Sequence, residues 1–588
     1  MSALKRYLRP YYCYIAVTIT IKLLGSVLEL LIPNLMEIIL DEKVPSGDKQ
    51  SIFLLGGLML LCAFGCLSLN ILANRMSAVS SGKITLSLRH DLFRKLESLS
   101  ARQMDALTVS SAESRLTSDT YNINQLLART QRLGVRAPIL LLGGVAMTLS
   151  MDPLLALVLI AMLPMIAVVV YFVTKTSIPL YAKQQSVLDK VVRTVQENIT
   201  GIRVIKALSK TEYEKERFYC VNEELSAVDR KAGAVTAITD PAASLILNLG
   251  LTLVVVIGAI RVNDGACKSG VIVAFLQYFI MILNAMLGIT RIFVMWSKGT
   301  ASARRVGQVL ESPEDLTVLA SEDLAAPAPK DLSAQTSTEP PSSAPHIEFR
   351  NVTFSYTGTG TNLEKLSFQL EHGQTLGILG PTGSGKSTIL NLLMRLYDPD
   401  EGQVLIDGVD VRTISREELR KKFGVVFQND FIMEGTIADN MRFFRDLPGS
   451  ALERAANDAQ ADFIREKEGR MDAQVTTRGN NLSGGQKQRL LISRALAANP
   501  EILVLDDASS ALDYRTDANL RRALRRNYRH TTTVVVAQRV SSLRHADLIL
   551  VLADGVVIGA GNHMYLMEHC AEYREIAQIQ MGVGKEGT

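Results

Sequence analysis

A strong excess of charge of either sign and an organised set of cysteines are both missing from this sequence. Its 588 residues include 63 lysines and arginines and 59 aspartates and glutamates, so the formal net charge is only +4. So small an excess gives a nucleic-acid partner no electrostatic footprint. The six cysteines are scattered, and Cys62 and Cys66 lie one helical turn apart in an apolar stretch, as small buried hydrophobes do. Their spacing predicts neither a disulfide framework nor a metal-ligand motif.

A cleavable signal peptide is not apparent at the start of the chain. The opening residues, MSALKRYLRPYY, are basic and amphipathic, but no small-residue cleavage site follows them. We interpret this segment as a helix that lies on a membrane surface and points Lys5, Arg6 and Arg9 toward lipid headgroups.

Apolar residues are concentrated in the first half of the chain. They form six stretches long enough to span a bilayer, and the third, which is short, is expected to extend toward Arg129. The predicted spans are Tyr14–Leu40, Ile52–Asn74, Val135–Leu149, Pro153–Val173, Pro241–Ile260 and Val271–Val294.

The connections between these spans alternate in length. Asp41–Ser51, Ser150–Asp152 and Arg261–Gly270 are short, whereas Arg75–Gly134 and Thr174–Asp240 are long and rich in Lys and Arg. Because basic connections stay in the cytoplasm, we predict a multi-pass membrane protein with both termini cytoplasmic. The long connections keep a helical pattern, which predicts helices reaching on the order of 40 Å beyond the membrane.

The composition changes again after the last span. From Glu311 to Pro345 the chain is rich in Ala, Pro, Ser, Thr and acidic residues, and such a segment cannot bury enough apolar area to order itself. The remaining residues alternate strand and helix patterns. We therefore predict a membrane domain over 1–310, a flexible linker over 311–345 and a soluble α/β domain over 346–588.

The stretch GILGPTGSGKST, Gly377–Thr388, contains the pattern G-x-x-x-x-G-K-S. A candidate strand, Thr375–Leu379, precedes the loop, and a candidate helix, Ile389–Leu396, follows it, which is the context of a phosphate-binding P-loop. The glycines let backbone N–H groups turn onto phosphate oxygens, and the helix N-terminus adds positive potential. The predicted ATP-binding residues here are Gly380, Thr382, Gly383, Ser384, Gly385, Lys386, Ser387 and Thr388.

Several side chains, in the P-loop and further along the chain, are of types that bind Mg²⁺ and ATP. Lys386 is expected to reach the β- and γ-phosphates, and the Ser387 hydroxyl to ligate Mg²⁺. Gln428 ends an apolar strand, and its amide can ligate Mg²⁺ or orient water. Asp506 ends the apolar run ILVLD and would bring a carboxylate to the same ion. Tyr356 could stack on adenine or be an ordinary strand tyrosine.

A second glycine-containing corner, LSGGQ, precedes the helical run KQRLLISRAL. A hydroxyl, two glycines and a helix N-terminus form an anion-binding corner. The sequence SALD follows Asp506 shortly afterwards. The predicted ATP contacts in these two motifs are Ser483, Gly484, Gly485, Gln486 and Asp513.

With these motifs in this order, the chain resembles an ABC transporter half-unit of the exporter type. The resemblance covers nearly the whole chain and implies six long transmembrane helices with cytoplasmic extensions, fused to one α/β P-loop NTPase domain of ABC type. It implies an ATPase that couples hydrolysis to transport, with ATP and Mg²⁺ held between the P-loop of one chain and the LSGGQ of another. Segments Ser114–Asp119 and Gly201–Phe218 resemble the regions that couple the two domains.

Two residues at the expected catalytic centre depart from the family pattern. Asp507 stands where the family places a Glu that polarises the attacking water, and Gln538 stands where it places a His. Asp is one methylene shorter, so its carboxylate falls back by about 1.5 Å, which near-attack geometry tolerates poorly. Gln cannot carry charge or shuttle a proton as His does. We expect the catalytic positions Asp507, Gln538 and Gln428 to support ATP binding with slow hydrolysis.

This combination resembles the degenerate-site subunits of bacterial heterodimeric multidrug-type exporters. We therefore predict a non-identical half-transporter as partner, whose competent site this chain's LSGGQ completes. Two alternatives stay open, a slow homodimeric exporter and an ATP-binding regulatory subunit that does not transport. The expected location is the bacterial cell membrane, with the nucleotide domain cytoplasmic.

Polar residues recur on one side of two predicted spans. Gln277 and Asn284 lie seven residues apart in the sixth span, and Lys22 and Glu29 do so in the first. Because seven residues are nearly two helical turns, each pair forms a stripe. We predict that Glu29, Gln277 and Asn284 line a cavity for a drug, lipid or peptide, although such residues also join helices within a bundle.

Overall fold

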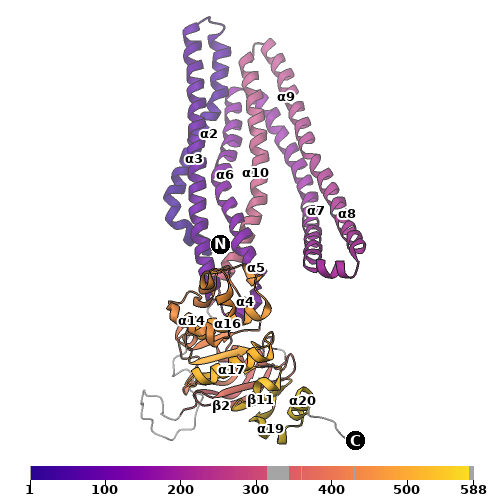
Figure 1. Cartoon of the computed structure of the whole chain (residues 1–588). Helices are drawn as coiled ribbons and strands as arrows, with labels where there is room; N and C mark the ends of the chain where they lie inside the picture. The colour runs from indigo at the N-terminus through magenta and orange to yellow at the C-terminus, as the bar shows by residue number, and fades with distance from the viewer. Residues whose placement is uncertain (1, 314–343, 359, 429–430, 582–588) are drawn as a thin grey trace, which may run out of the picture. The chain divides into compact units, whose positions relative to one another are not determined.

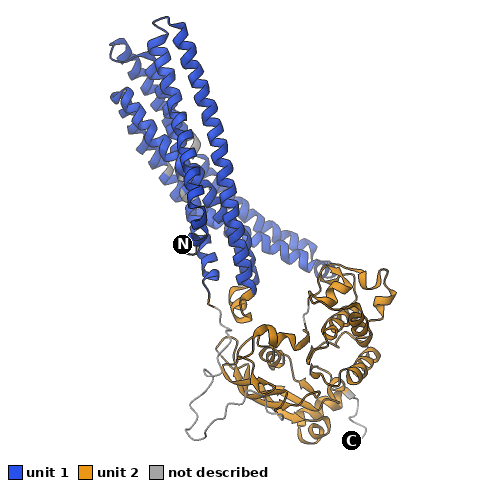
Figure 2. Cartoon of the chain, turned by 90° about the vertical axis from the view of Figure 1, so that its left-hand side faces the viewer, with its two compact units in different colours: residues 1–97, 109–312 blue, residues 98–108, 313–588 orange. Residues whose placement is uncertain are grey.

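The computed structural model divides the chain into two compact units (Figure 2). The predicted linker over 311–345 falls almost entirely outside the residues that the structure describes. The described residues are 2–313, 344–358, 360–428 and 431–581. Unit 1 comprises residues 1–97 and 109–312, and unit 2 comprises residues 98–108 and 313–588.

Unit 1 is built from long helices (Figure 1). Among the described residues, six helical segments are long and apolar enough to cross a membrane, which confirms the six predicted spans. The helices are α1 (Ser2–Leu8), α2 (Tyr12–Ile38), α3 (Lys49–Ser98), α5 (Val109–Ser114), α6 (Thr120–Met151), α7 (Pro153–Ala207), α8 (Thr211–Ala237), α9 (Thr239–Asn263) and α10 (Ser269–Leu310). Short helical turns occupy Arg9–Tyr11, Ile39–Lys43 and Arg115–Asp119.

Several of these helices are much longer than a bilayer requires. The 55 residues of α7 correspond to about 80 Å of helix, against a hydrocarbon core of about 30 Å. α7 and α8 run side by side and diverge from the other helices of unit 1 toward the turn that joins them (Figure 1). The extensions expected from the long connections are therefore present.

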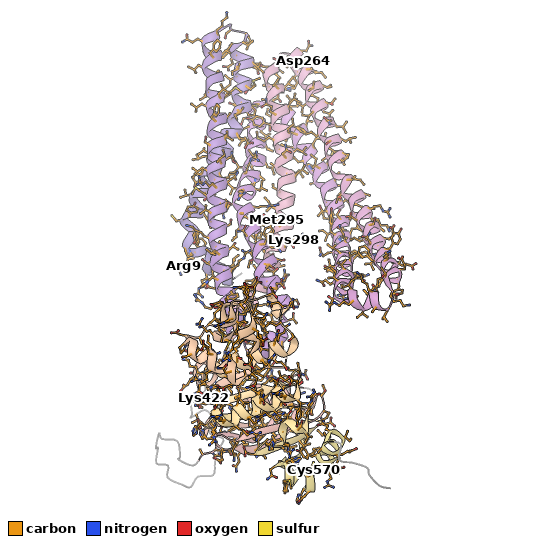
Figure 3. All side chains as sticks on the ribbon, in the orientation of Figure 1. Arg9, Asp264, Met295, Lys298, Lys422 and Cys570 are labelled. Carbon is orange, nitrogen blue, oxygen red and sulfur yellow. The ribbon has the colours of Figure 1, made fainter. Side chains whose placement is uncertain are left out.

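Carboxylates fix the ends of two membrane helices. Asp152 caps α7, because its Oδ1 accepts hydrogen bonds from the backbone of Leu154 at 2.9 Å and Leu155 at 3.1 Å. Asp41 does the same for α10, accepting from Gly270 N at 2.5 Å and from the next residue. Each bond satisfies an N–H group that a helix start leaves without a partner. The turn that contains Asp264 connects the end of α9 to the start of α10 (Figure 3).

Polar contacts also join helices inside unit 1. The buried Tyr278 of α10 donates a hydrogen bond to Leu30 O of α2 at 2.6 Å. The buried Asp119 accepts a hydrogen bond from Ser302 at 2.8 Å and pairs with Arg305. The predicted coupling segment Ser114–Asp119 thus packs against α10 within unit 1.

Unit 2 contains a four-stranded antiparallel sheet, β2-β1-β4-β5, and a six-stranded sheet, β12-β11-β3-β10-β9-β6. In the larger sheet only β12 is antiparallel to its neighbour. The strands are β1 (Ile347–Phe354), β2 (Leu363–Leu370), β3 (Thr375–Leu379), β4 (Glu401–Ile406), β5 (Val409–Asp410), β6 (Phe423–Val426), β7 (Gly435–Thr436), β8 (Gln474–Val475), β9 (Ile502–Asp506), β10 (Thr532–Val536), β11 (Leu548–Ala553) and β12 (Val556–Gly561).

Helices surround these sheets, and the apolar strand runs form a buried core with them. β9 is buried at all five positions, as expected for a parallel strand covered on both faces. The helices of unit 2 are α4 (Ala101–Leu107), α11 (Lys386–Leu393), α12 (Arg416–Lys421), α13 (Ile437–Arg442), α14 (Gly449–Asp458), α15 (Phe463–Glu466), α16 (Gly484–Ala497), α17 (Tyr514–Asn527), α18 (Val540–Leu543), α19 (His563–His569) and α20 (Ala571–Met581). The predicted α/β class of this half is confirmed.

α4 belongs to unit 2, although both of its neighbours along the chain belong to unit 1. Ser100 begins it with a capping box, in which Ser100 Oγ accepts from Gln103 N at 3.1 Å and the Gln103 side chain accepts from Ser100 N. The Tyr397 hydroxyl donates a hydrogen bond to Asp105 of α4. Arg416 donates a second bond, to Ser98 O, at 3.3 Å. This helix was not among the predicted functional segments, although S-x-x-Q is a recognisable helix-start signal.

Candidate nucleotide-binding site

The predicted strand, loop and helix around the P-loop are present as β3, the turn before α11, and α11 itself. Gly383 and Gly385 have positive φ values of 87° and 97°. A Cβ atom on Gly385 would also lie 2.8 Å from Asn362 O. Glycine is therefore required at Gly385 both for its backbone conformation and for space.

The Lys386 side chain folds over the loop. Its Nζ donates hydrogen bonds to Gly380 O at 2.9 Å and Pro381 O at 2.6 Å. These carbonyls hold the ammonium group beside the backbone N–H groups of the loop. The phosphate groups of a polyanion can accept hydrogen bonds from the same ammonium group. Such charge-assisted hydrogen bonds are stronger than those to neutral carbonyls.

The sheet order places the other predicted residues next to this loop. β10 lies between β3 and β9 and is parallel to both, so the carboxyl ends of the three strands meet at one edge. Ligands bind outside the carboxyl ends of strands in open α/β sheets. Asp506 ends β9, Asp507 follows it, and Gln538 comes after the end of β10, so these residues reach the P-loop from different parts of the chain.

A pocket of about 280 Å³ lies at this edge. It brings together most of the predicted site, including all three catalytic candidates and the three metal candidates, Ser387, Gln428 and Asp506. The lining residues are Tyr356, Asn362, Thr382, Gly383, Gly385, Lys386, Ser387, Thr388, Gln428, Asp506, Asp507, Val536, Ala537 and Gln538.

The oxygen atoms expected to hold Mg²⁺ are adjacent in this pocket. Ser387 Oγ donates a hydrogen bond to Asp506 Oδ2 at 3.0 Å. A hydroxyl and a carboxylate are hard oxygen ligands of the kind that Mg²⁺ takes together with substrate phosphates. The residues present therefore fit Mg²⁺ with ATP.

Burial shifts the pKa values of three charged groups in the pocket. It raises the pKa of the Asp506 carboxyl, although the Ser387 hydrogen bond opposes the shift. It also raises the pKa of Asp507, against the opposing charges of Arg539 and Lys386. It lowers the pKa of the Lys386 ammonium group. All three shifts arise because burial excludes the water that would otherwise stabilise the charged form of each group. A bound phosphate group and a cation would neutralise these charges.

Asp507 has a constrained position. Its φ is 52°, and its N–H donates to Val536 O at 2.9 Å. Ser510 donates both its N–H, at 3.2 Å, and its hydroxyl, at 2.9 Å, to Asp507 O. The backbone therefore fixes where the short carboxylate can reach.

Tyr356 lies in the wall of the pocket and is tied to α11. Its hydroxyl accepts a hydrogen bond from Asn391 at 2.9 Å, and it lies 3.4 Å from Thr388 Oγ1. Its ring packs edge-on against Phe354 and Tyr397. Asn362, which our sequence analysis did not single out, accepts from Tyr356 N at 3.0 Å. No motif marks Asn362, because only the fold places it there.

Two of the predicted P-loop residues lie behind the pocket surface. Ser384 is buried, and its hydroxyl has no hydrogen-bond partner among the described residues. A Cβ on Gly380 would lie 2.4 Å from Leu552 O, so this glycine permits close packing of β3 and β11.

The residues of LSGGQ and SALD do not line this pocket. Ser483 and Gln486 form an exposed capping box at the start of α16, with Gln486 N donating to Ser483 Oγ at 3.3 Å. Gly484 and Gly485 form its first turn. Asp513 caps α17 by accepting from Thr516 N at 2.9 Å. Within one chain, this set of residues and the P-loop pocket are separate surfaces.

In unit 1, the three predicted cavity residues line one cavity of about 320 Å³. Gln277 and Asn284 are exposed on α10, and Glu29 faces them from α2. The Glu29 carboxylate pairs with Arg136 of α6 through bonds of 2.6 and 3.1 Å. Arg136 was not among the predicted cavity residues, because only the packing of α2 on α6 forms this ion pair.

A second cavity, of about 480 Å³, shares Glu29 and Arg136 with the first. It also contains Lys22, which is buried and donates to Asn70 Oδ1 at 2.5 Å and to Asn74 Oδ1 at 3.4 Å. Charged and amide side chains thus line both cavities along one side of α2.

Comparisons with known proteins cover both units. Two family models match, ABC transporter transmembrane region at residues 15–286 and ABC transporter at residues 363–510. An uncharacterized ABC transporter ATP-binding protein of Mycobacterium tuberculosis is 32% identical, over 99% of this chain and 98% of its own length. A fatty acid ABC transporter ATP-binding/permease protein of Mycobacterium bovis is 31% identical, over 86% and 78%. A solved bacterial Atm1-family ABC exporter with ATP bound has a TM-score of 0.79 and 25% identity, over 98% of this chain and 99% of its own.

Proposed function

The chain belongs to the ABC transporter family, as an exporter half-transporter with a six-helix membrane domain fused to one ATP-binding domain, and we propose that it is the degenerate-site subunit of a heterodimer. It is an ATP-driven exporter of the Atm1 type. In the proposed complex, its P-loop holds one ATP at a slow site, and its LSGGQ completes the fast site of a non-identical partner.

The observation that carries this proposal is the position of Asp507 and Gln538 in the P-loop pocket beside Lys386. The two residues that depart from the family pattern thus lie where an attacking water would be activated. A carboxylate set back by one methylene polarises that water poorly, and an amide cannot accept its proton as an imidazole can. Loss of a general base typically costs about 10²–10⁴ in rate.

The binding apparatus favours retained affinity for ATP. Lys386, Ser387 and Asp506 keep the residue types of the family, and their contacts hold them at one pocket. When bound, Mg-ATP would supply the phosphoryl group and the charge that these side chains neutralise. The chain's own residues would orient the phosphates, share the metal and exclude water from the pocket.

The exposed LSGGQ favours a role in a second site. Ser483 and the N-terminus of α16 lie outside the P-loop pocket of the same chain. Two chains are therefore needed to enclose each nucleotide. Since the signature residues are intact, the site that they complete on a partner can be fully active.

Two alternatives make different predictions. A slow homodimeric exporter would transport when this chain is the only one present. An ATP-binding regulatory subunit would bind nucleotide with any partner, but substitutions in its membrane cavity would leave transport unchanged. Transport by proteoliposomes with and without the partner tests the first alternative, and transport by the complex with substitutions in the membrane cavity of this chain tests the second.

We propose that the substrate is amphipathic, as a drug, lipid or peptide can be. Gln277, Asn284 and the Glu29–Arg136 pair offer polar contacts beside apolar side chains such as Ile280. Lys22 and Arg136 outnumber the single carboxylate of Glu29 across the two cavities, which favours an acidic headgroup. The similarity to a fatty acid transporter agrees with such a substrate.

We further propose that the chain lies in a bacterial cell membrane, with both termini and unit 2 cytoplasmic. The basic residues of the two long connections, Arg75–Gly134 and Thr174–Asp240, support this orientation. The domain assignment of 1–310, 311–345 and 346–588 belongs to the same proposal, although α4 lies in the membrane segment of the chain and belongs to unit 2.

Cross-linking in native membranes, followed by purification through this chain, tests the partner. We expect a complex of one copy of this chain and one other half-transporter that carries Glu at the position of Asp507. Recovery of self-paired chains only would contradict the heterodimer and favour the slow homodimer.

A further inference from the structure

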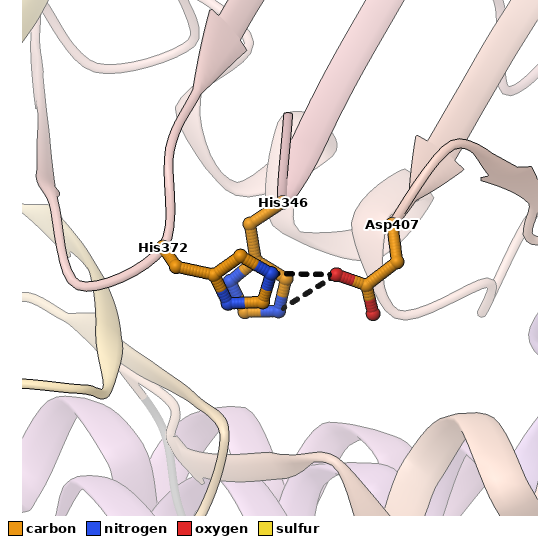
Figure 4. Close-up of side chains that lie close together, drawn as sticks. All are labelled: His346, His372 and Asp407. Carbon is orange, nitrogen blue, oxygen red and sulfur yellow. Dashed lines mark ion pairs between the residues drawn. The ribbon is translucent and has the colours of Figure 1, made fainter. Parts of the chain in front are cut away.

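Three side chains from separate segments of unit 2 meet at one end of the four-stranded sheet (Figure 4). His346 directly precedes β1, His372 lies in the turn after β2, and Asp407 follows β4. The strand registers align the start of β1 with the ends of both neighbours. Sheet pairing therefore brings the three residues together, and Asp407 N donates to His346 O at 3.0 Å.

The side chains converge on one carboxylate oxygen. His372 Nε2 lies 2.9 Å from Asp407 Oδ1, and His346 Nε2 lies 3.9 Å from the same atom. The two imidazole rings stack with centroids 3.8 Å apart and planes 12° apart. One ligand atom from each residue lies within 4.8 Å of the other two.

His346 is held in place from the side opposite Asp407. Its Nδ1 lies 2.6 Å from Thr532 Oγ1, and that oxygen also accepts from Gly373 N at 3.0 Å. In the tautomer in which Nδ1 donates to Thr532, Nε2 carries the lone pair. His346 is 0% exposed, and its Nε2 has no hydrogen-bond partner among the described residues. A buried polar atom without a partner costs free energy that a bound ligand would recover.

We propose that His346, His372 and Asp407 form a binding site for a divalent transition-metal ion of the zinc class. Imidazole nitrogen and carboxylate oxygen are ordinary zinc ligands, and three protein ligands leave a fourth position for water. Mg²⁺ and Ca²⁺ prefer sites made of oxygen alone, so this donor set selects against them. The Thr532 contact is the kind of outer interaction that orients a ligating histidine.

The distances suit such an ion after a small movement. Two ligands that are each about 2.0–2.1 Å from a tetrahedral zinc lie about 3.4 Å apart, and the observed distances of 2.9 and 3.9 Å fall on either side of that value. Because the rings are nearly parallel, one of them must rotate to point its lone pair at the ion. The side chain of His372 is 61% exposed on a turn, so it is the ring that can rotate.

The surrounding charges favour a cation. Lys422 lies 3.5 Å from Asp407 Oδ2, but Glu501 takes the same ammonium group at 2.5 Å. Two carboxylates and one ammonium group leave a net charge of −1 beside the histidines.

Titration of the full chain with Zn²⁺ tests the proposal. The protein is purified without a polyhistidine tag, freed of metal with a chelator, kept free of nucleotide and studied in detergent or nanodiscs. Calorimetry should find one Zn²⁺ per chain, and Co²⁺ should give the visible absorption of a tetrahedral site. Zn²⁺ should also raise the denaturation temperature, because an ion that binds only the folded chain stabilises it.

His372→Ala is the informative variant, because its exposed ring can be removed without disturbing the core. Its Zn²⁺ affinity should fall by on the order of 10–100-fold or more, and Asp407→Asn should behave alike. His569→Ala is the matched control, since His569 is an exposed histidine of unit 2 outside the cluster. Equal zinc binding by His372→Ala, His569→Ala and the unmodified chain would overturn the proposal. Zinc binding requires no partner chain or ATP turnover, so its outcome is independent of the proposed function.

Discussion

Ser387 Oγ donates a hydrogen bond to Asp506 Oδ2 at 3.0 Å, across 119 positions of sequence. Ser387 lies in the first turn of α11 and Asp506 ends β9, so the bond joins the P-loop to a strand two places away in the sheet. The two oxygen atoms expected to share Mg²⁺ are therefore adjacent within one chain.

Replacement of Lys386 by Ala should weaken ATP binding by about 10–100-fold, because a hydrogen bond to a charged group contributes about 1.5–3 kcal/mol. Titration with a fluorescent ATP analogue measures the change. Lys421→Ala is the control, since Lys421 pairs with Glu417 on the exposed side of α12. Equal affinities of the two variants would show that Lys386 does not contact the phosphates.

The double replacement Asp507→Glu and Gln538→His should raise ATP hydrolysis by the self-paired chain by about 10²-fold or more, because it restores a longer base and an imidazole. ATP affinity should stay the same, since the P-loop is unchanged. Steady-state hydrolysis in lipid, compared at saturating ATP, measures the effect. The degenerate-site proposal fails if the unmodified chain already matches the double variant and loses its activity on Asp507→Asn.

Replacement of Gln277 and Asn284 by Ala should reduce substrate stimulation of hydrolysis and leave basal hydrolysis intact, because both amides line the membrane cavity. Stimulation by a series of amphipathic acids, measured with the partner present, provides the readout. Asn248→Ala on α9 is the control, because its amide bonds to Ser244 O of its own helix at 2.9 Å. A loss of folding or assembly would instead indicate that these amides join helices.

Tyr397→Phe should impair the coupling of transport to hydrolysis while ATP affinity is retained. The change removes a hydrogen bond that ties α4, which lies between α3 and α5 of the membrane domain along the chain, to the rest of unit 2. A bond to a carboxylate contributes about 1.5–3 kcal/mol. The ratio of substrate transported to ATP hydrolysed measures coupling.

Tyr528→Phe is the matched control for this bond. Tyr528 donates to Asp458 at 3.1 Å inside unit 2, away from α4. Tyr528→Phe should lower the stability of the fold without changing the ratio of substrate transported to ATP hydrolysed. If both variants change the ratio equally, the effect of Tyr397 is one of general stability.

Local patterns predicted much of the site. Gly383, Gly385, Lys386 and Ser387 lie within a few residues of one another, so their spacing alone indicated the loop, which the structure confirms. The same holds for the six spans, because each membrane helix must be continuously apolar. Asp506 could be predicted because it ends a fully buried strand.

Residues that depend on distant contacts could not be predicted in this way. The Glu29–Arg136 pair needs α2 to pack on α6, and Asn362 reaches the pocket only through the pairing of β1 with β2. The predicted coupling segment Ser114–Asp119 packs within unit 1, whereas the neighbouring α4 joins unit 2.

The amino-acid sequence by itself determined which segments are long and apolar enough to span the membrane and where the P-loop lies, because hydrophobic length and glycine spacing act over one helix or one loop. Only the tertiary structure decided which side chains become neighbours. His346, His372 and Asp407 have no recognisable spacing, and strand pairing alone joins them. The physical reason is that a sheet register aligns residues far apart in the chain, and no short stretch of sequence contains both partners.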